Sequence, residues 1–393
     1  MNGGPGASSV VFGFFGELGP YFLDDDSMQN KTTPGVPDLK ENPYAWNKIA
    51  NVLFLESPAN VGYSYCDDPS CRWDDTTGAE TNYEALLKFF EEFPEYKDNE
   101  LFITGESYGG MYVPSLVEQI HNGHGAVNLK GFAVGNGIIG HSDSFPGANA
   151  IHYETLHNHG FLSEVQWAAI EKECSATFKL TGKVTYPDAC QALLTKASAT
   201  AGKFYVYDIY DTCGSDQVKT TGTLADFEEA LHLGQPGAGP GTEPAYSPYG
   251  CGKNRVAEVY LDLPAVREAI HVKFVPSTQN PTGKPDYEGN TYHYWHPQAN
   301  ASANEGWNYN QSRMHLLDIY PTLAAAYRTL IFNGDFDACV PYLHNEKWTQ
   351  FLADQEGWKT VSFQWKNPDF QWKNPDFLLK NPDVLLKNVN FII

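Results

Sequence analysis

Short apolar runs that end in turn residues recur along the chain, and such runs are typical of buried parallel strands. They predict strands at residues 52–55, 101–104, 131–134 and 329–332. Between them lie segments with apolar residues at helical spacing, notably 79–93 and 111–121. Strands that alternate with helices predict an α/β protein whose central sheet is mostly parallel and flanked by helices.

The middle of the chain breaks this alternation. Residues 137–255 contain four cysteines, a helical pattern at 164–174 and the Gly/Pro-rich stretch 234–241. We interpret 137–255 as an inserted cap region whose loops would shape a pocket above the sheet. The core would then consist of a first part at 1–136 and a second part at 256–363.

The C-terminal residues 364–393 form a repeat of seven residues. Four copies follow one another, QWKNPDF, QWKNPDF, LLKNPDV and LLKNVNF. Proline in three of these copies interrupts helices and strand ladders alike, so we expect a poorly ordered tail without a stable packed element. Because the repeat is inconsistent with any local structure, we favour a duplication artefact over a binding tail.

The charge of the chain narrows the range of partners. Lysine and arginine number 26 and aspartate and glutamate 48, which gives a formal net charge of −22. This balance, with no basic run, argues against nucleic acid or an anionic membrane as a partner. No apolar run approaches the length of a membrane span. At 393 residues, the chain has room for one large domain with an insertion or for two domains.

The seven cysteines lack the paired spacing of a zinc site, so disulfides are the better interpretation. Cys66 and Cys71 could close a small loop. Four more fall in one mid-chain region, with their connectivity left open: Cys174, Cys190, Cys213 and Cys251. Cys339 is the candidate for the unpaired cysteine.

Three Asn-x-Ser/Thr triplets, at Asn30, Asn300 and Asn310, agree with a protein of the secretory pathway. Residues 1–20 show no signal-peptide pattern, which leaves a cytosolic protein or one whose beginning lies outside this sequence as alternatives. Disulfides and triplets together favour the secretory pathway.

The strongest candidate for chemistry is the sequence LFITGESYGG at 101–110. An apolar strand runs into a Gly-x-Ser-x-Gly turn centred on Ser107, and a helical pattern follows. A sharp turn of this kind lifts a serine hydroxyl out of the sheet as a nucleophile. The bare pattern also occurs by chance, but the flanking strand and helix favour the nucleophile.

Four other segments fit an acyl-transfer site. The glycine loop NGGPG at 2–6 would let backbone N–H groups approach an oxyanion, although an ordinary turn is the alternative. The acid-bearing segment NGDFD at 333–337 follows a strand late in the chain, as in hydrolases with the order serine, acid, histidine, although a turn former is the alternative. Residues 51–65 could wall the site. Glu17 lies in an apolar stretch, where a buried glutamate needs a partner, and Glu106 could be that partner.

Taken together, these segments closely resemble the serine carboxypeptidase family, peptidases of the α/β-hydrolase superfamily that remove C-terminal residues. The resemblance spans about residues 2–363 and rests on NGGPGASS, NVLFLESPANVGYSY, FITGESYGGMYVP, HGFLSEVQ, YLDLPAVREAIHV and NGDFDACVPY. It implies that Ser107 is the nucleophile and that Asp337 orients the base. It also implies that Gly4 and Tyr108 supply the N–H groups of the oxyanion hole, and that no cofactor or metal is needed.

The resemblance further implies how the terminal carboxylate of a peptide substrate would be bound. Asn2, Gly3, Glu17 and Glu106 would contact it, with one proton shared between the two glutamates. Because two adjacent carboxylates cannot both ionise cheaply, one stays protonated and donates to the substrate. We therefore expect the strongest peptide binding at acidic pH.

The chain departs from the family pattern at three places. The family's Gly-x-Gly-His motif, which supplies the base, does not occur, and the last histidine is His344. We find no catalytic histidine among the others, which include His141, His152, His157, His159, His293 and His296. The motif at 2–6 starts without the preceding strands of the family, and Ala7 stands where many members have a disulfide cysteine.

Three functions remain open at this point. The first is a serine-type carboxypeptidase that forms an acyl-enzyme on Ser107. The second is an inactive binding or protective homologue, because the histidine motif does not occur. The third is an acyltransferase of the serine carboxypeptidase-like type, which the pair Glu17 and Glu106 makes less favoured, since the pair suits a free carboxylate. The sequence leaves the oligomeric state and the preferred side chain open.

Overall fold

The computed structural model of the chain describes residues 1–23, 27, 32, 36–59, 61–66, 71–123, 125–140, 148–174, 186–202, 204, 206–210, 255–272, 309–358, 361–364 and 387–391. Contacts divide the chain into two compact units. The first unit comprises Met1–Gly78 and Leu231–Asn310, and the second comprises Ala79–Ala230 and Gln311–Ile393. The sequence-based boundaries at 137, 256 and 364 stay predictions.

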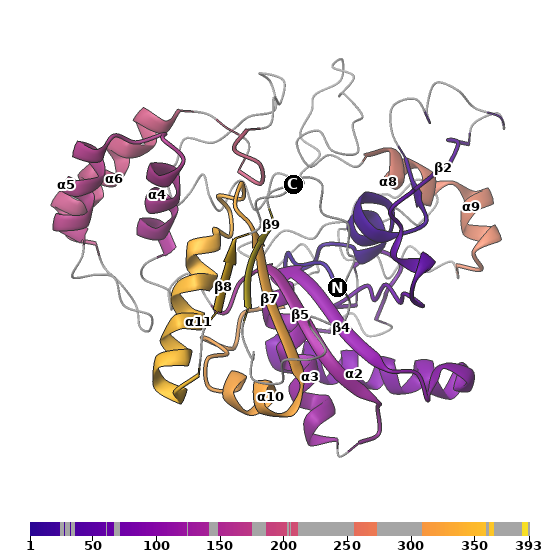
Figure 1. The fold of residues 1–393 in the computed structure, drawn as a ribbon. Helices are drawn as coiled ribbons and strands as arrows, with labels where there is room; N and C mark the ends of the chain where they lie inside the picture. Colours follow the sequence, from indigo (N-terminus) through magenta and orange to yellow (C-terminus); the bar gives the residue numbers. More distant parts are fainter. Residues whose placement is uncertain are drawn as a thin grey trace. The chain divides into compact units, whose positions relative to one another are not determined.

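The second unit is built on a five-stranded parallel sheet in the order β4-β5-β7-β9-β8 (Figure 1). The strands are β4 (Leu101–Ser107), β5 (Leu129–Gly137), β7 (Arg328–Gly334), β8 (Val361–Gln364) and β9 (Lys387–Phe391). Three of the four predicted strands, at 101–104, 131–134 and 329–332, are confirmed as parts of β4, β5 and β7. The predicted α/β class with a mostly parallel sheet is therefore confirmed.

Helices form where the apolar spacing predicted them. The helix predicted at 79–93 is α2 (Asp75–Glu92), and the one predicted at 111–121 is α3 (Gly109–Asn122). Helix α3 contacts β4 and β5, α10 (Tyr320–Ala326) contacts α3 and β7, and α11 (Tyr342–Glu356) contacts β5, β7 and β9. A short 3-10 helix, η3 (Pro94–Tyr96), follows α2.

Part of the predicted cap region is helical. Helices α4 (Ala148–Asn158), α5 (Glu164–Cys174) and α6 (Asp188–Ala201) pack on one another, and α4 also contacts α11 (Figure 1). The helix predicted at 164–174 is confirmed with the same bounds. The Gly/Pro-rich stretch 234–241 lies outside the described residues.

Strand β9 differs from the prediction for the repeat tail. It lies between β7 and β8 and pairs in parallel with both. The expectation that no packed element forms in 364–393 is wrong for residues 387–391. The reason is local: β9 falls in the last copy of the repeat, LLKNVNF, where valine replaces the proline of the other three.

The first unit has its own small apolar core. Strands β1 (Tyr21–Phe22) and β2 (Lys40–Glu41) pair antiparallel, and β3 (Trp73–Asp74) pairs in parallel with β6 (Tyr309–Asn310). The helices are the π-helix η1 (Ser9–Leu18), the 3-10 helix η2 (Trp46–Lys48), α8 (Arg255–Asp262) and α9 (Pro264–Ala269). The core joins η1 to α8 through Val11, Phe15, Leu23, Val256, Ala257 and Leu261.

The strand predicted at 52–55 is wrong, because these residues have no regular secondary structure and Leu53 is 49% exposed. An extended segment becomes a strand only when a neighbour pairs with its backbone. Among the described residues no strand pairs with this segment. The apolar side chains of a segment do not show whether a neighbouring strand is present.

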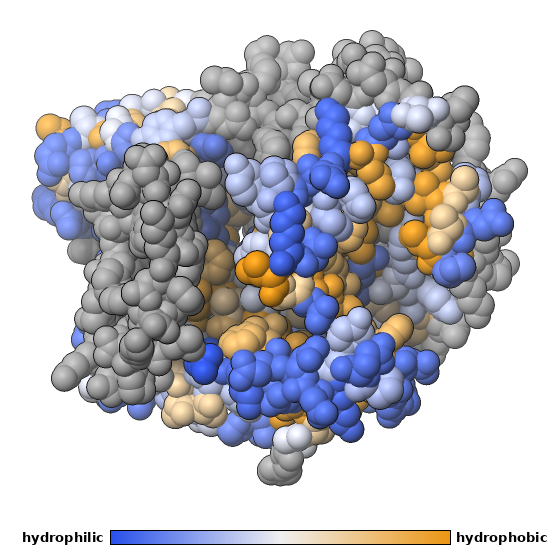
Figure 2. Space-filling model, turned by 45° about the vertical axis from the view of Figure 1, so that its right-hand side comes forward, coloured by the Kyte–Doolittle hydropathy of each residue, from blue (hydrophilic) through white to orange (hydrophobic). Residues whose placement is uncertain are grey.

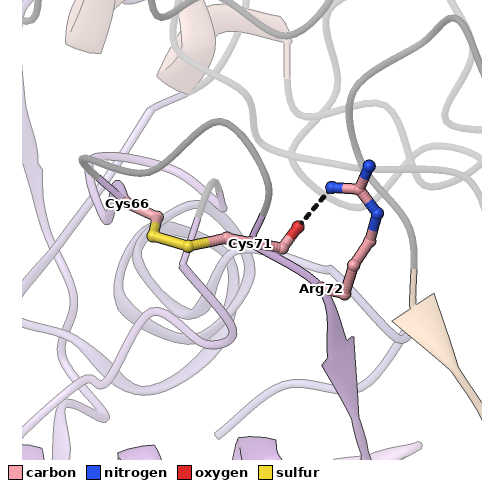
Figure 3. Close-up of a disulfide and its surroundings, with 3 residues drawn as sticks. All are labelled: Cys66, Cys71 and Arg72. Carbon is pink, nitrogen blue, oxygen red and sulfur yellow. Dashed lines mark hydrogen bonds between the residues drawn. A yellow bond between two sulfur atoms is a disulfide. The ribbon is translucent and has the colours of Figure 1, made fainter.

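Two disulfides are present in the described part of the chain. Cys66 pairs with Cys71, as the spacing suggested, and Arg72 Nη1 donates to the Cys71 carbonyl over 2.7 Å (Figure 3). Cys174 pairs with Cys190, which decides one of the connectivities left open. Cys339 is a buried free thiol, as expected. Cys213 and Cys251 lie outside the described residues.

Hydrophilic side chains occupy much of the surface seen in Figure 2, with apolar side chains exposed between them. Among the helices that the structure describes, none is both long and apolar enough to cross a bilayer.

Candidate active site

Ser107 is the last residue of β4, and its backbone has a φ of 57°. Side chains other than glycine rarely adopt this left-handed conformation, and they keep it only where the surroundings fix it. Here α3 begins two residues later, and the Ser107 carbonyl accepts a hydrogen bond from the Ile138 N–H over 2.9 Å. The predicted strand-turn-helix geometry of a nucleophile elbow is therefore present at Ser107.

Gly110 allows α3 to approach the end of β5. A Cβ atom at this position would lie 2.1 Å from the Ile138 carbonyl oxygen, which is backbone and cannot move aside easily. The glycine is therefore required for close packing of the helix behind the nucleophile. Tyr108, which the resemblance assigns to the oxyanion hole, is buried at the N-terminal end of α3.

The acid-bearing segment leaves the same edge of the sheet as Ser107. β5 lies between β4 and β7, and all three strands run in parallel. The carboxyl ends of parallel strands meet at one edge, and strands two places apart are roughly 10 Å apart. We call residues 334–340, which follow β7 and carry Asp337, the acid loop.

The Asp337 carboxylate is held from within its own loop. Its Oδ1 accepts the N–H of Cys339 over 2.6 Å and that of Val340 over 3.2 Å. Its pKa is raised to about 7, mainly by loss of hydration on burial and in part by the nearby charge of Glu106, while the bonds from Cys339, Val340 and the Asn136 side chain oppose this rise. Asp337 and Glu106 are thus close enough to influence each other's charge.

The sequence analysis missed Asn136, which lies at the end of β5 between the two catalytic strands. Its Nδ2 donates to the carbonyls of Gly334 over 3.0 Å and Val340 over 3.2 Å, and its Oδ1 accepts the Gly334 N–H over 2.8 Å. The triplet Gly-Asn-Gly at 135–137 directly after a buried strand was the available signal. A polar residue at the carboxyl end of a parallel strand lies at the edge of the sheet where Ser107 and the acid loop also lie.

A second set of side chains supports the acid loop from α11. Asn333 Nδ2 donates to the Val340 carbonyl over 3.4 Å, and Asn345 Nδ2 donates to Asn333 Oδ1 over 2.9 Å. The indole N–H of Trp348 donates in turn to Asn345. All three side chains are buried, so each of these bonds satisfies polar groups that water does not reach.

Residues of the predicted cap region also bond to the acid loop. The N–H of Ala338 donates to the Val206 carbonyl over 2.8 Å, and the N–H of Ile209 donates to the Phe336 carbonyl over 3.0 Å. His152 of α4 lies 2.9 Å from the Ala338 carbonyl through its Nδ1, and burial lowers the pKa of this imidazole. Residues far apart in the sequence thus fix the backbone on both sides of Asp337.

No histidine is among the groups that bond to the Asp337 carboxylate in the described part of the chain. His344, the last histidine, is buried in α11, where loss of hydration lowers its pKa to about 4. The described residues also contain no group of three side chains that could hold a metal ion.

The glycine loop at 2–6 belongs to the first unit, and its backbone needs glycine. Gly4 has a φ of 113°, and a Cβ atom there would lie 2.4 Å from the Gly6 nitrogen. The buried Asn2 donates from its backbone N–H to Ser9 Oγ over 3.0 Å and from Nδ2 to Glu17 Oε1 over 3.1 Å. Asn2 and Glu17, both assigned to carboxylate binding, therefore lie together, whereas the expectation of a buried Glu17 is wrong because its side chain is exposed.

Ser8, which follows the glycine loop, fixes the start of η1. Its Oγ accepts the N–H groups of Val10 over 3.1 Å and Val11 over 3.0 Å and donates to Glu56. Glu56 accepts the Tyr63 N–H over 2.7 Å as well. The predicted wall segment 51–65 thus supports the glycine loop from within the first unit, through a residue that the sequence analysis did not single out.

Comparisons with known proteins agree with this geometry. The profile of a family described as serine carboxypeptidase matches residues 1–371. The lysosomal protective protein of Mus musculus is 32% identical over 372 residues, which cover 90% of this chain and 70% of the relative. Serine carboxypeptidase-like 26 of Arabidopsis thaliana is 33% identical over 347 residues, 87% of this chain and 66% of the relative.

Among solved structures, a prohormone-processing carboxypeptidase from Saccharomyces cerevisiae has a similar fold. The TM-score is 0.57 at 16% identity, and the match covers 94% of this chain and 73% of the other. At this identity the likeness concerns the fold alone.

Proposed function

Because the chain belongs to the serine carboxypeptidase family, we propose that it is a serine-type carboxypeptidase that releases C-terminal residues from peptides through an acyl-enzyme on Ser107. The observation that carries this proposal is the left-handed turn at Ser107, at the sheet edge from which the Asp337 loop also leaves. A nucleophile and an acid two strands apart match the arrangement of α/β-hydrolases. Peptide or protein C-termini would be the substrates.

Each site residue would have one role in this reaction. Ser107 Oγ would attack the carbonyl of the last peptide bond, and Asp337 would orient the base that takes the serine proton. The N–H groups of Gly4 and Tyr108 would stabilise the oxyanion. The resulting ester would be hydrolysed by water.

The terminal carboxylate of the substrate would be recognised by Asn2, Gly3, Glu17 and Glu106. The hydrogen bond from Asn2 to Glu17 supports their common role, since it keeps both side chains together. A proton shared between the glutamates would favour binding at acidic pH. The two disulfides agree with an oxidising compartment of the secretory pathway, such as a lysosome or vacuole, or with the extracellular space.

One observation favours a second function, an inactive binding or protective homologue. The Gly-x-Gly-His motif does not occur in the sequence, and no described histidine bonds to Asp337. Without a base, serine remains a weak nucleophile, and only the catalysis by the oxyanion hole and by binding is left. An acyltransferase is less favoured, because paired glutamates suit a free carboxylate in the substrate.

A fluorophosphonate probe separates these functions. We expect the wild-type chain to be labelled at Ser107, identified by peptide mapping, and the variant Ser107→Ala to remain unlabelled. The matched control is Ser163→Ala, which changes an exposed serine of the same unit and should be labelled like wild type. A wild-type chain that binds peptides with a free C-terminus but is not labelled would support the binding homologue instead.

A further inference from the structure

Asn136 makes more contacts with the acid loop than any role in β5 alone requires. Its side chain bonds to the N–H and the carbonyl of Gly334, the first residue of the loop, and to the carbonyl of Val340, the last. One side chain therefore joins both ends of the segment that carries Asp337. These ends are six residues apart in the sequence, and Asn136 is about two hundred residues away from them.

The backbone at Asn136 is adapted to this contact. Its φ is 39°, in the left-handed region that asparagine tolerates better than most other side chains. In the ladder between β4 and β5, Glu106 pairs with Gly135 and Ser107 pairs with Gly137, so the pairing passes over Asn136. The residue thus turns out of the ladder beside the nucleophile and towards the loop after β7.

We propose that Asn136 is a positioning residue, which clamps both ends of the acid loop and thereby fixes the Asp337 carboxylate for its role beside Ser107. The inference deepens the proposed function and rests on it for that role. Val340 carries the effect, because its carbonyl is held by Asn136 while its N–H donates to Asp337 Oδ1. A shift of the Val340 backbone would therefore move a donor away from the carboxylate.

The surroundings of Asp337 determine how a loss of the clamp would be seen. Glu106 raises the pKa of Asp337, whereas the donors from Cys339, Val340 and Asn136 lower it. Burial and Asp337 itself raise the pKa of the Cys339 thiol, so this neighbour stays neutral when Asp337 titrates. His152 faces the loop at the Ala338 carbonyl. If the donors are lost, Glu106 and burial determine the pKa of Asp337, which should therefore rise.

Two variants remove the clamp in different ways. Asn136→Gly deletes the side chain but keeps a backbone that adopts positive φ without strain. Asn136→Asp keeps the acceptor for the Gly334 N–H and loses the donors to the two carbonyls. Asn128→Gly is the matched control, since Asn128 also donates to two backbone carbonyls, those of Asp98 over 3.0 Å and Asn99 over 3.2 Å, just before the opposite end of β5.

The measurement is the pH at which Asp337 titrates, followed by carbon NMR of labelled aspartate carboxyl groups, together with the rate of fluorophosphonate labelling. In Asn136→Gly we expect the titration to move up by about one pH unit and labelling at Ser107 to slow about tenfold. Asn136→Asp should move it further, because it adds a carboxylate. Asn128→Gly should leave both readouts at the wild-type values.

The inference would be overturned if Asn136→Gly and Asn136→Asp lowered the melting temperature as Asn128→Gly does but left the Asp337 titration in place. Failure of the proposed function looks different. In that case the wild-type chain is not labelled at all, while the titration still reports whether Asn136 controls Asp337. If Asn136→Gly fails to fold, Asn136→Asp decides the matter with the same readout.

Discussion

The acid loop of the second unit and the glycine loop of the first unit both present groups suited to catalysis, but different contacts hold them. The acid loop is fixed by side chains and backbone from β5, α11 and the predicted cap region. Two of the residues that bond to it are distant in the sequence: Val206 is about 130 residues away and Asn136 about 200. Asn2 of the glycine loop bonds to Ser9 and Glu17, within 15 residues, and the adjoining Ser8 bonds to Glu56 of the same unit. One loop therefore depends on the completed sheet and the other on contacts within the first unit.

This difference predicts how damage should spread. A change behind the acid loop should disturb the sheet edge and lower the stability of the second unit as a whole, because the parallel strands are hydrogen-bonded to one another. A change beside the glycine loop should stay within η1 and its surroundings. The following predictions test this distinction, beginning with the largest effect.

The largest effect is expected for Gly110→Ala. The added Cβ would meet the Ile138 carbonyl, so α3 would have to move away from β5, and we expect a loss of more than about 3 kcal/mol in the free energy of unfolding. Gly78→Ala is the matched control, because Gly78 also lies near the start of a helix and has no atom closer than 3.8 Å. That control should gain up to about 1 kcal/mol. Urea unfolding that shows equal stability for both variants would contradict the packing argument.

The next effect is expected for Asp337→Asn, and it depends on pH. The raised pKa of about 7 means that folded Asp337 keeps a proton between pH 4 and 7 that the unfolded chain has released. Wild-type stability should therefore fall as the pH rises through this window, by about 4 kcal/mol in total. The variant, which carries no titrating group, should lack this fall.

Urea unfolding at several pH values from 4 to 8 measures this slope. Asp335→Asn serves as the control, since it removes a carboxylate from the same loop and should keep the wild-type slope. If Asp337→Asn also keeps that slope, the burial of an uncharged Asp337 is not the cause.

The smallest effect is expected at the glycine loop, with Ser8→Ala. This buried side chain accepts two N–H groups of η1 and donates to Glu56, so its loss should cost about 1–2 kcal/mol. The control is Ser163→Ala, an exposed serine whose Oγ accepts the Gln166 N–H over 3.3 Å at the start of α5, with a loss below about 1 kcal/mol. Hydrogen exchange should accelerate at Val10 and Val11 but not in β5. Faster exchange in β5 would show that the two loops are not independent.

The same contrast explains what the sequence could predict. Strands β4, β5 and β7, helix α5 and the elbow at Ser107 follow from patterns that neighbouring residues complete among themselves. Asn136 and Val206 could not be assigned to the acid loop, because their partners are distant in the sequence. The segment 52–55 has the composition of a strand, but a strand also needs a neighbour, which composition does not show.

The repeat tail and Glu17 illustrate two further limits. Proline in three copies predicted that no strand ladder would form in the tail, yet the fourth copy, which lacks proline, forms β9. An apolar neighbourhood in the sequence suggested that Glu17 is buried, but on η1 this residue is exposed. In both cases one position, Val389 or Glu17, differs from what the composition of its segment predicts.

The central claim is that the chain removes C-terminal residues through Ser107. The most direct measurement is the release of the last amino acid from an N-blocked dipeptide at acidic pH by the wild-type chain and by Ser107→Ala, with the C-terminally amidated dipeptide as a control substrate. The proposed function predicts release by the wild-type chain, at least about tenfold less by Ser107→Ala and little from the amide. Equal release by both chains, or none by the wild-type chain, would contradict it.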